Sequence, residues 1–209
     1  MSSSQASVAN LAIINGSPRK HGNTEILLDR VAQGFTDRGG KSRTIRLHDS
    51  GIGYCTGCFA CLKQLKRPCR LKDSMDEIYE VLFEAEAIVL GSPVYFWSVS
   101  AQMKTFLDRL FPFGDYQTTS WAKKFSGIPF GVVLVYADKD PLLSGAGLAY
   151  EQIKVVIECT GGTAAHLLHY SANDIGDIRE NEQALKEAEQ TGAALYEQCR
   201  SSGSRRQGG

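Results

Sequence analysis

The chain has 209 residues, of which 43% are hydrophobic and 22% charged, and its 23 Lys and Arg residues balance its 23 Asp and Glu residues. This length suits one domain with a sizeable core, and zero net charge argues against nucleic acid or an anionic membrane as a partner. The longest apolar run near the start, residues 11–14, is too short for a secretory signal, and no segment approaches the roughly 20 apolar residues of a membrane span. We therefore expect a cytoplasmic protein in a reducing compartment, where structural disulfides are rare.

Short apolar runs alternate with amphipathic stretches along the chain. The runs, which predict strands, cover residues 8–14, 42–47, 87–90, 130–136 and 164–169. The stretches with apolar residues at three- and four-residue spacing, which predict helices, cover residues 23–35, 76–85, 101–110, 151–158 and 181–199. This alternation predicts an α/β fold: a flavodoxin-like three-layer sandwich around a five-stranded parallel sheet of order 2-1-3-4-5.

The domain organisation predicted from this pattern is simple. A single domain covers residues 1–200 and carries a cysteine-rich insertion at residues 50–72. Residues 201–209 are rich in Ser, Gly and Arg, and this composition predicts a disordered tail.

The segment after the first strand, NGSPRKHGNTEILL, is the first candidate binding site, because open α/β sheets bind ligands beyond the carboxyl ends of their strands. Its glycines allow close approach to an anion, Ser17 and Thr24 offer hydroxyls, and Arg19 offers charge. Asn23 or Thr24 can cap the helix that follows, whose N-terminal amides favour a phosphate. The segment has neither a Walker pattern nor G-x-G-x-x-G, so it indicates neither a nucleoside triphosphate nor a dinucleotide. An ordinary strand-to-helix turn would have the same composition.

The segment after the third strand, GSPVYFWSVSAQMKTFLDRL, lies on the other side of the same switch point. Tyr95, Phe96 and Trp97 follow Pro93 in an unbroken aromatic run. Flat rings beside backbone amides suit a planar heterocycle with a polar edge. A hydrophobic contact between subunits would also account for them.

These two segments together resemble the paired FMN-binding loops of the NADPH-dependent FMN reductase family, a flavodoxin-like family that includes the iron–sulfur flavoproteins. The resemblance extends over about residues 8–199. The residues that it assigns to the FMN phosphate are Ser17, Arg19, Asn23 and Thr24. Those that it assigns to the isoalloxazine are Pro93, Val94, Tyr95, Phe96, Trp97 and Ser98. The segment YADKDPLLSGAG takes the place of the family's third flavin-contacting loop, with Ala137 and Asp138 as contacts, although it departs from the usual glycine-rich form.

Four cysteines lie within fifteen residues at the spacing C-x2-C-x2-C-x7-C: Cys55, Cys58, Cys61 and Cys69. Structural zinc sites usually use two knuckles a dozen or more residues apart, whereas this spacing resembles the cluster-binding run of bacterial ferredoxins. Iron–sulfur flavoproteins carry a compact motif of this kind between the second strand and the second helix. The four cysteines are thus candidate ligands of a [4Fe–4S] cluster. Unligated or redox-active thiols, a zinc site and a disulfide remain as alternatives.

The resemblance implies that FMN takes hydride from NAD(P)H and then passes electrons to an acceptor. For the first of these half-reactions we expect no protein nucleophile or general base to be essential. The preferred hypothesis is an enzyme that reduces flavin, a quinone or another small acceptor. A second hypothesis is an electron carrier whose cluster serves a redox protein partner. A third is a dehydrogenase for one metabolite, whose substrate pocket over the flavin would be formed by residues 111–121. Net neutrality disfavours a carrier that finds its partners by charge.

Two expectations concern residues outside these motifs. Phe111, Phe113, Tyr116 and Trp121 form a segment too apolar to leave in water, which predicts a homodimer or homotetramer with the flavin near the subunit boundary. His166 and His169 fall on opposite faces of a predicted strand with no partner nearby in sequence, so we assign them no catalytic role.

Overall fold

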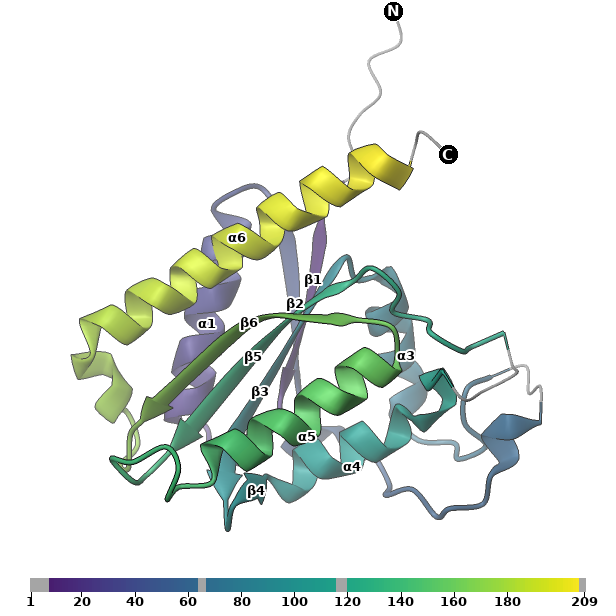
Figure 1. The fold of residues 1–209 in the computed structure, drawn as a ribbon, viewed down its shortest axis with the longest axis horizontal. Coiled ribbons are helices and arrows are strands. Elements are labelled where there is room, and N and C mark those ends of the chain that lie inside the picture. Colours follow the sequence, from purple (N-terminus) through teal and green to yellow (C-terminus); the bar gives the residue numbers. More distant parts are fainter. Residues whose placement is uncertain (1–7, 64–66, 116–119, 207–209) are drawn as a thin grey trace, which may run out of the picture.

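The computed structural model describes residues 8–63, 67–115 and 120–206, and its centre is a parallel sheet between two layers of helices (Figure 1). The parallel strands are β1 (Asn10–Asn15), β2 (Lys41–Arg46), β3 (Ala87–Tyr95), β5 (Pro129–Tyr136) and β6 (Thr163–Ser171). Their order is β2-β1-β3-β5-β6, and the short strand β4 (Ser98–Val99) pairs antiparallel with the end of β3. Counted over the parallel strands, this order is the predicted 2-1-3-4-5, so the flavodoxin-like prediction is confirmed.

Helices cover both faces of the sheet (Figure 1). One layer consists of α1 (Asn23–Thr36) and α6 (Glu182–Arg206), and the other of α3 (Met75–Glu84), α4 (Ala101–Arg109) and α5 (Ala146–Cys159). The short elements are α2 (Leu47–Ser50) and the 3₁₀ turns η1 (Ala60–Leu62), η2 (Phe111–Phe113) and η3 (Asp177–Glu180).

The core is divided by the sheet into two clusters, and the alternation of strand side chains explains the division. In β1, Leu11 and Ile13 pack against the layer of α1 and α6, whereas Ala12 and Ile14 pack against the opposite layer. The central strands are buried on both faces, which is why they read as continuous apolar runs. The edge strand β2 is largely exposed, which agrees with its polar sequence KSRTIR.

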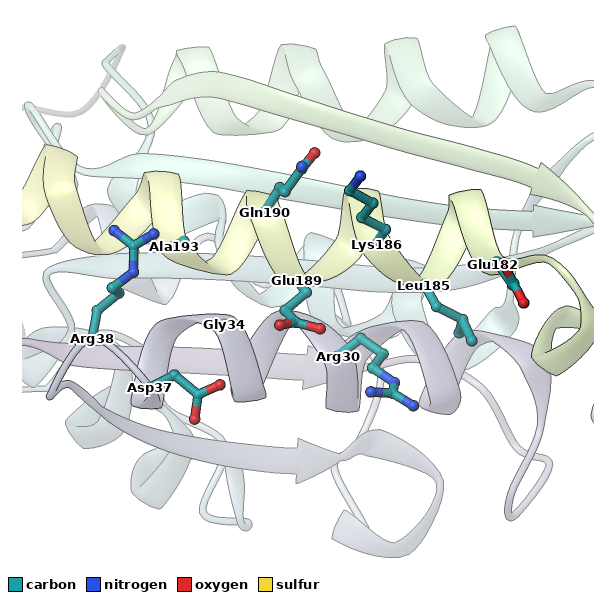
Figure 2. Close-up of a pocket in the computed structure, with 10 residues that line it drawn as sticks. All are labelled: Arg30, Gly34, Asp37, Arg38, Glu182, Leu185, Lys186, Glu189, Gln190 and Ala193. Carbon is teal, nitrogen blue, oxygen red and sulfur yellow. The ribbon is translucent and has the colours of Figure 1, made fainter.

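Helices α1 and α6 cross at very short range because glycines lie at the contact. A Cβ added to Gly34 would lie 1.9 Å from the backbone oxygen of Glu189, and one added to Gly192 would be equally close to an α1 carbonyl. Beside this crossing, a groove runs between the two helices with Arg30, Asp37 and Glu189 along it (Figure 2). Its lining within the described chain contains no thiol or aromatic ring and none of the predicted site residues.

The C-terminal segment differs from its prediction. Helix α6 continues to Arg206, into the stretch that composition predicted to be disordered, and residues 207–209 lie outside the described chain. Extending an existing helix adds one backbone hydrogen bond for each residue fixed, which is far less costly than starting a new helix. In the part of the chain that is described, no helix combines the length and the apolar character needed to cross a membrane.

Candidate functional site

The loop after β1 is shaped by its own polar side chains. Asn15 is fully buried at the end of the strand, and its Oδ1 accepts a hydrogen bond from the backbone N–H of Ser17 at 2.9 Å. The Ser17 hydroxyl oxygen accepts the Arg19 N–H at 3.3 Å, and the exposed Arg19 guanidinium donates to the carbonyl of Asn173 at 3.3 Å. The predicted anion-binding side chains Ser17 and Arg19 are therefore held together at the carboxyl edge of the sheet.

Asn23, which the resemblance assigned to the phosphate, lines the loop hollow described below, and its side chain also bonds the segment after β6. Its side chain accepts hydrogen bonds from the N–H groups of Gly176 at 2.9 Å and Ile178 at 3.3 Å, and donates to the carbonyl of Asp174 at 2.7 Å. These bonds tie the start of α1 to the segment after β6. No side chain of the described residues caps α1 at Gly22, so its first amides present the positive end of the helix to the loop. Asn23 is thus placed to offer a backbone N–H rather than its amide side chain.

A salt bridge that the sequence analysis did not anticipate connects this loop to the end of β2. Glu25, in the first turn of α1, accepts a hydrogen bond from the N–H of His21 and pairs with Arg46 at 2.6 Å. Both partners of the pair are about four-fifths buried, with side chains 18% and 19% exposed. Arg46 ends β2, and Glu25 lies in the helix that follows β1. Their approach therefore depends on how β1 and β2 pair, which sequence patterns do not give.

The aromatic run forms the tip of a β-hairpin between β3 and β4. Phe96 and Trp97 are its two turn residues, with φ angles of 48° and 62°. Residues with side chains seldom adopt this left-handed conformation, which hairpin turns usually reserve for Asn and Gly. Trp97 is fixed by a 2.8 Å hydrogen bond from its indole N–H to the carbonyl of Leu143, whereas Phe96 is 91% exposed. Strain of this kind persists where the surrounding structure enforces it, often at a functional site.

Two adjoining hollows bring the three predicted loops together. The first, here the loop hollow, lies at the start of α1 and is lined by Ser17, Arg19, Gly22, Asn23, Thr24, Pro93, Val94, Tyr95, Val135, Tyr136, Ala137, Ala172 and Asn173. The second, here the hairpin hollow, has a volume of about 460 Å³ and is lined by Val94, Phe96, Trp97, Tyr136, Ala137, Asp138, Leu143, Ser144 and Asn173. All the residues predicted to contact FMN line one or both hollows except Ser98. The Ser98 hydroxyl instead donates to the side chain of Gln152 on α5 at 2.9 Å.

His169, for which the sequence showed no partner, contacts a residue of both hollows. Its Nδ1 lies 3.1 Å from the hydroxyl oxygen of Tyr136, and the two rings stack with centroids 6.0 Å apart. Tyr136 ends β5 and His169 lies in the neighbouring strand β6. Their approach follows from strand register, so no pattern in the sequence could have revealed it.

The four cysteines of the motif line a single cavity of about 240 Å³, together with Thr56, Gly57, Phe59, Arg70, Leu71, Asp108, Arg109, Phe111 and Pro112. Their thiols differ in environment. The backbone N–H of Ala60 bonds the Cys58 sulfur and lowers the pKa of this exposed thiol. Burial raises the pKa of Cys61, and the neighbouring thiols contribute in the same direction. The sequence prediction that these four residues belong to one site is consistent with this arrangement.

Arg109 clamps both ends of the cysteine segment to α4. Its Nη1 and Nη2 bond the two carboxylate oxygens of Asp73 at 2.7 and 3.0 Å, and Nη1 also donates to the carbonyl of Gly53 at 2.7 Å. Asp73 in turn accepts the N–H of Gly53 at 2.9 Å, and the Tyr79 hydroxyl donates to the Arg109 carbonyl at 2.6 Å. The Arg109 side chain is only 1% exposed. The segment that carries the four cysteines is therefore anchored on both sides, at Gly53 and at Asp73.

Residues 9–139 match the family described as NADPH-dependent FMN reductase. The chain belongs to this family. An iron–sulfur flavoprotein from Archaeoglobus fulgidus is 40% identical over 124 residues, which cover 59% of this chain and 53% of that protein. Another iron–sulfur flavoprotein of the same organism is 30% identical over 189 residues, covering 85% of this chain and 91% of that protein. These relatives support the predicted subgroup of the family.

The extent of these similarities differs from one relative to the next. The chain spans about half the length of the first three curated relatives that it matches, between 47% and 53%. Among solved structures, an NAD(P)H:quinone oxidoreductase from Methanothermobacter marburgensis is similar with a TM-score of 0.69 over 90% of this chain and 98% of that chain. Their sequence identity is 16%, so this similarity supports the fold alone.

The hollows of this FMN reductase family member fit the cofactor that the family name implies. Arg19 and the hydroxyls of Ser17 and Thr24 stand beside the amides of α1, a donor set suited to a phosphate. The hairpin hollow adds the aromatic walls of Phe96 and Trp97, which suit a flat ring system. The assignment of individual FMN contacts stays a prediction.

The cysteine cavity fits a cluster in the kind and number of its ligands. Among the described residues, no three His, Cys, Asp or Glu side chains converge closely enough to hold a metal ion. Four thiols around one cavity are the type and number of ligands that a [4Fe–4S] cluster takes, and a structural zinc site can take the same set, so both stay predictions.

The apolar segment predicted to face another subunit is largely internal. Phe113 is fully buried, and Trp121 stacks on Phe83 with centroids 5.6 Å apart. Tyr116 lies outside the described residues. Phe111 lines the cysteine cavity rather than either hollow. Phe111 and Trp121 remain partly exposed, so the subunit contact and the substrate pocket over the flavin stay predictions.

Proposed function

We propose that this protein is an FMN-dependent oxidoreductase that takes hydride from NAD(P)H and reduces flavin, a quinone or another small acceptor. The observation that carries the proposal is the pair of adjoining hollows, which three separate loops build at the carboxyl edge of the sheet. Bound FMN would supply hydride and single-electron chemistry that no side chain offers. The family assignment supports the cofactor.

In this proposal the residues of the chain bind the FMN phosphate and orient its ring system. Arg19, Ser17 and Thr24 hold the phosphate at the start of α1, where the helix dipole favours negative charge. The hydrogen bond from Trp97 to Leu143 fixes the hairpin that walls the second hollow. A wall held in this way covers one side of a flat ligand and excludes water from it.

The test is an anaerobic titration of the FMN-loaded protein. Addition of NADPH or NADH should bleach the flavin absorption, and a quinone should then restore it. Protein that holds FMN but is bleached by neither nucleotide would contradict the proposal. A comparison of the two nucleotides also decides which one is the donor.

A second candidate function, an electron carrier with a [4Fe–4S] cluster, is favoured by the cysteine cavity and by relatives named iron–sulfur flavoproteins. A cluster there would supply one-electron transfer to a redox protein. Cys55, Cys58, Cys61 and Cys69 would be its ligands. Protein purified without oxygen should then contain about four irons and matching sulfide per chain. Wild-type protein free of iron and sulfide after anaerobic reconstitution would exclude this candidate.

The variant Cys58→Ala separates the two functions. If the cluster is the only exit for electrons, the variant keeps NAD(P)H bleaching but loses transfer to a one-electron protein acceptor. If the flavin alone serves the acceptor, both half-reactions continue and a quinone is reduced at the wild-type rate. We favour the second outcome, because the aromatic hairpin beside the hollow suits a small planar acceptor.

Assembly and location are also proposals. We propose a homodimer or homotetramer in the cytoplasm, as closed symmetric assemblies are common among soluble proteins. Of the aromatic residues at 111–121 that motivate this assembly, Phe113 is buried within the chain, whereas Phe111 and Trp121 remain partly exposed. Light scattering at micromolar concentration tests it, and a monomer would contradict it.

A further inference from the structure

Tyr136 is the one ionisable ring shared by the described linings of both hollows. It is the last residue of β5 and only 6% exposed. Its hydroxyl oxygen lies 3.1 Å from Nδ1 of His169, whose side chain is exposed on β6. The pair thus connects the interior of the predicted flavin site with solvent. No catalytic residue was predicted from the sequence. Neither the FMN binding nor the hydride transfer proposed above requires Tyr136 or His169.

We propose that Tyr136 donates a proton to a quinone-class acceptor bound beside the flavin in the hairpin hollow, and that His169 positions Tyr136 and reprotonates it. This inference rests on the proposed function and names its acceptor class. Ring carbonyls of such an acceptor become hydroxyls on reduction, so each electron pair must be matched by protons. A site built only for one-electron transfer would need no proton donor.

The surroundings of Tyr136 suit this role. Phe96 and Trp97 line the same hollow and offer aromatic surface to a planar acceptor. Asp138 also lines the hollow, and Asp140 lies close enough to influence Tyr136. Burial, and next the negative charge of Asp140, raise the pKa of Tyr136. The phenol therefore keeps its proton at neutral pH until an acceptor takes it.

The proposed step balances in atoms and charge. FMN, when bound and reduced by NAD(P)H, would supply the acceptor with one hydride, which carries two electrons and one hydrogen. The Tyr136 O–H bond breaks as its proton forms an O–H bond on the acceptor carbonyl oxygen, which yields the hydroquinone. The Tyr136 phenolate then takes the proton on Nδ1 of His169 while Nε2 of the same ring takes one from solvent, so the imidazole stays neutral. Donation by a positioned side chain typically accelerates such a step by about 10²–10⁴-fold.

Strand β6 supplies matched controls on its opposite face. Tyr170 bonds the carboxylate of Glu187, and His166 lies 3.1 Å from the side chain of Gln198, both partners being on α6. Neither Tyr170 nor His166 belongs to the described lining of the two hollows. Changes at these positions remove a phenol and an imidazole from β6, the strand that carries His169, without touching the proposed proton path.

The first experiment measures reoxidation of photochemically reduced, FMN-loaded protein by stopped flow, so it does not depend on NAD(P)H. Two acceptors are compared: benzoquinone, which needs protons, and ferricyanide, which takes single electrons without them. Tyr136→Phe should slow reoxidation by benzoquinone about 100-fold and leave ferricyanide within about twofold of wild type. Tyr170→Phe should change neither rate. Equal slowing with both acceptors, or no slowing with either, would overturn the inference.

The second experiment tests His169 by chemical rescue. His169→Ala should slow benzoquinone reduction, and added imidazole should restore the rate because the position is open to solvent. His166→Ala should show neither the loss nor the rescue. A loss that imidazole does not restore would mean that His169 acts only by packing. Failure of NAD(P)H to bleach the wild-type flavin would refute the proposed donor, whereas the acceptor comparison would still decide the role of Tyr136.

Discussion

The pair formed by Arg109 and Asp73 allows a stability prediction with a defined size. The Arg109 side chain is 1% exposed and that of Asp73 is 17% exposed, with two N–H···O contacts of 2.7 and 3.0 Å between them. Asp73→Asn keeps the size of the side chain but leaves a buried guanidinium without its counter-charge. Breaking a buried pair in this way costs about 3–5 kcal/mol. We expect the lower end, about 3 kcal/mol, because the Asn oxygen still accepts one of the bonds.

Urea unfolding of wild type and variant measures this loss directly, and the slope of the transition should stay unchanged. The midpoint of thermal unfolding should fall by roughly 6–12 °C for a chain of this size. The control is Lys104→Gln on the same helix, whose pair with Asp108 is exposed, with side chains 54% and 45% accessible. Such surface pairs contribute less than about 1 kcal/mol. Equal losses in Asp73→Asn and Lys104→Gln would refute the reasoning.

The same pair predicts how stability depends on acid. Burial disfavours the Asp73 carboxylate, but hydrogen bonds from Arg109 and from the N–H groups of Gly53 and Met75 outweigh it, so its pKa is lowered. A lowered pKa stabilises the fold above the unfolded value of about 3.9, and this contribution is lost as the pH falls through the folded value. The stability difference between wild type and Asp73→Asn should therefore be constant near neutrality and shrink below about pH 4. A difference that stayed constant into acid would contradict the assignment.

Three further changes test other parts of the structure. Arg19→Ala combined with Thr24→Ala should weaken FMN binding tenfold or more by ultrafiltration, because charge-assisted phosphate contacts are lost; unchanged retention would contradict the phosphate assignment. Gly34→Ala should destabilise by about 1–3 kcal/mol in urea, since its Cβ would meet α6 backbone at 1.9 Å, whereas Gly147→Ala, with open space around it, should not. Phe96→Asn should raise the thermal midpoint, as Asn tolerates the left-handed turn, while slowing turnover with planar acceptors; a lowered midpoint would argue against strain there.

The sequence could predict what depends on neighbours along the chain. Hydrophobic runs placed the parallel strands, and the turn after β1 placed Ser17 and Arg19 where the structure has them. The hairpin was expected only as a loop, because the third strand was predicted to end at residue 90, whereas β3 continues through the partly polar stretch up to Tyr95. Pairing with β5 and β4 supplies the hydrogen bonds that hold Pro93 and Tyr95 extended, and no local pattern reports such pairing.

What the sequence could not predict are contacts between residues distant along the chain. Asn23 is a residue type that often caps helices, yet its side chain bonds a segment about 150 positions later. His169 has no partner nearby in sequence, yet strand register brings it to Tyr136, 33 positions away. Polar side chains have several equally plausible local roles, and tertiary packing selects among them. Local inference therefore found the segments that line the hollows, but not the long-range contacts that hold those segments in place.

Helix α4 links the two candidate sites physically. At its start, the Ser100 hydroxyl accepts the Met103 N–H at 3.1 Å and donates to the carbonyl of Gly16 at 2.7 Å, beside the phosphate loop. At its end, Arg109 holds the cysteine segment through Asp73. A nine-residue helix rises about 14 Å, so the separation of the two attachment points is set by the helix. Hydrogen bonds at the two ends of α4 therefore place the cysteine cavity and the loop hollow at opposite ends of one helix. Electron exchange between a flavin and a group on the cysteines would have to span this separation.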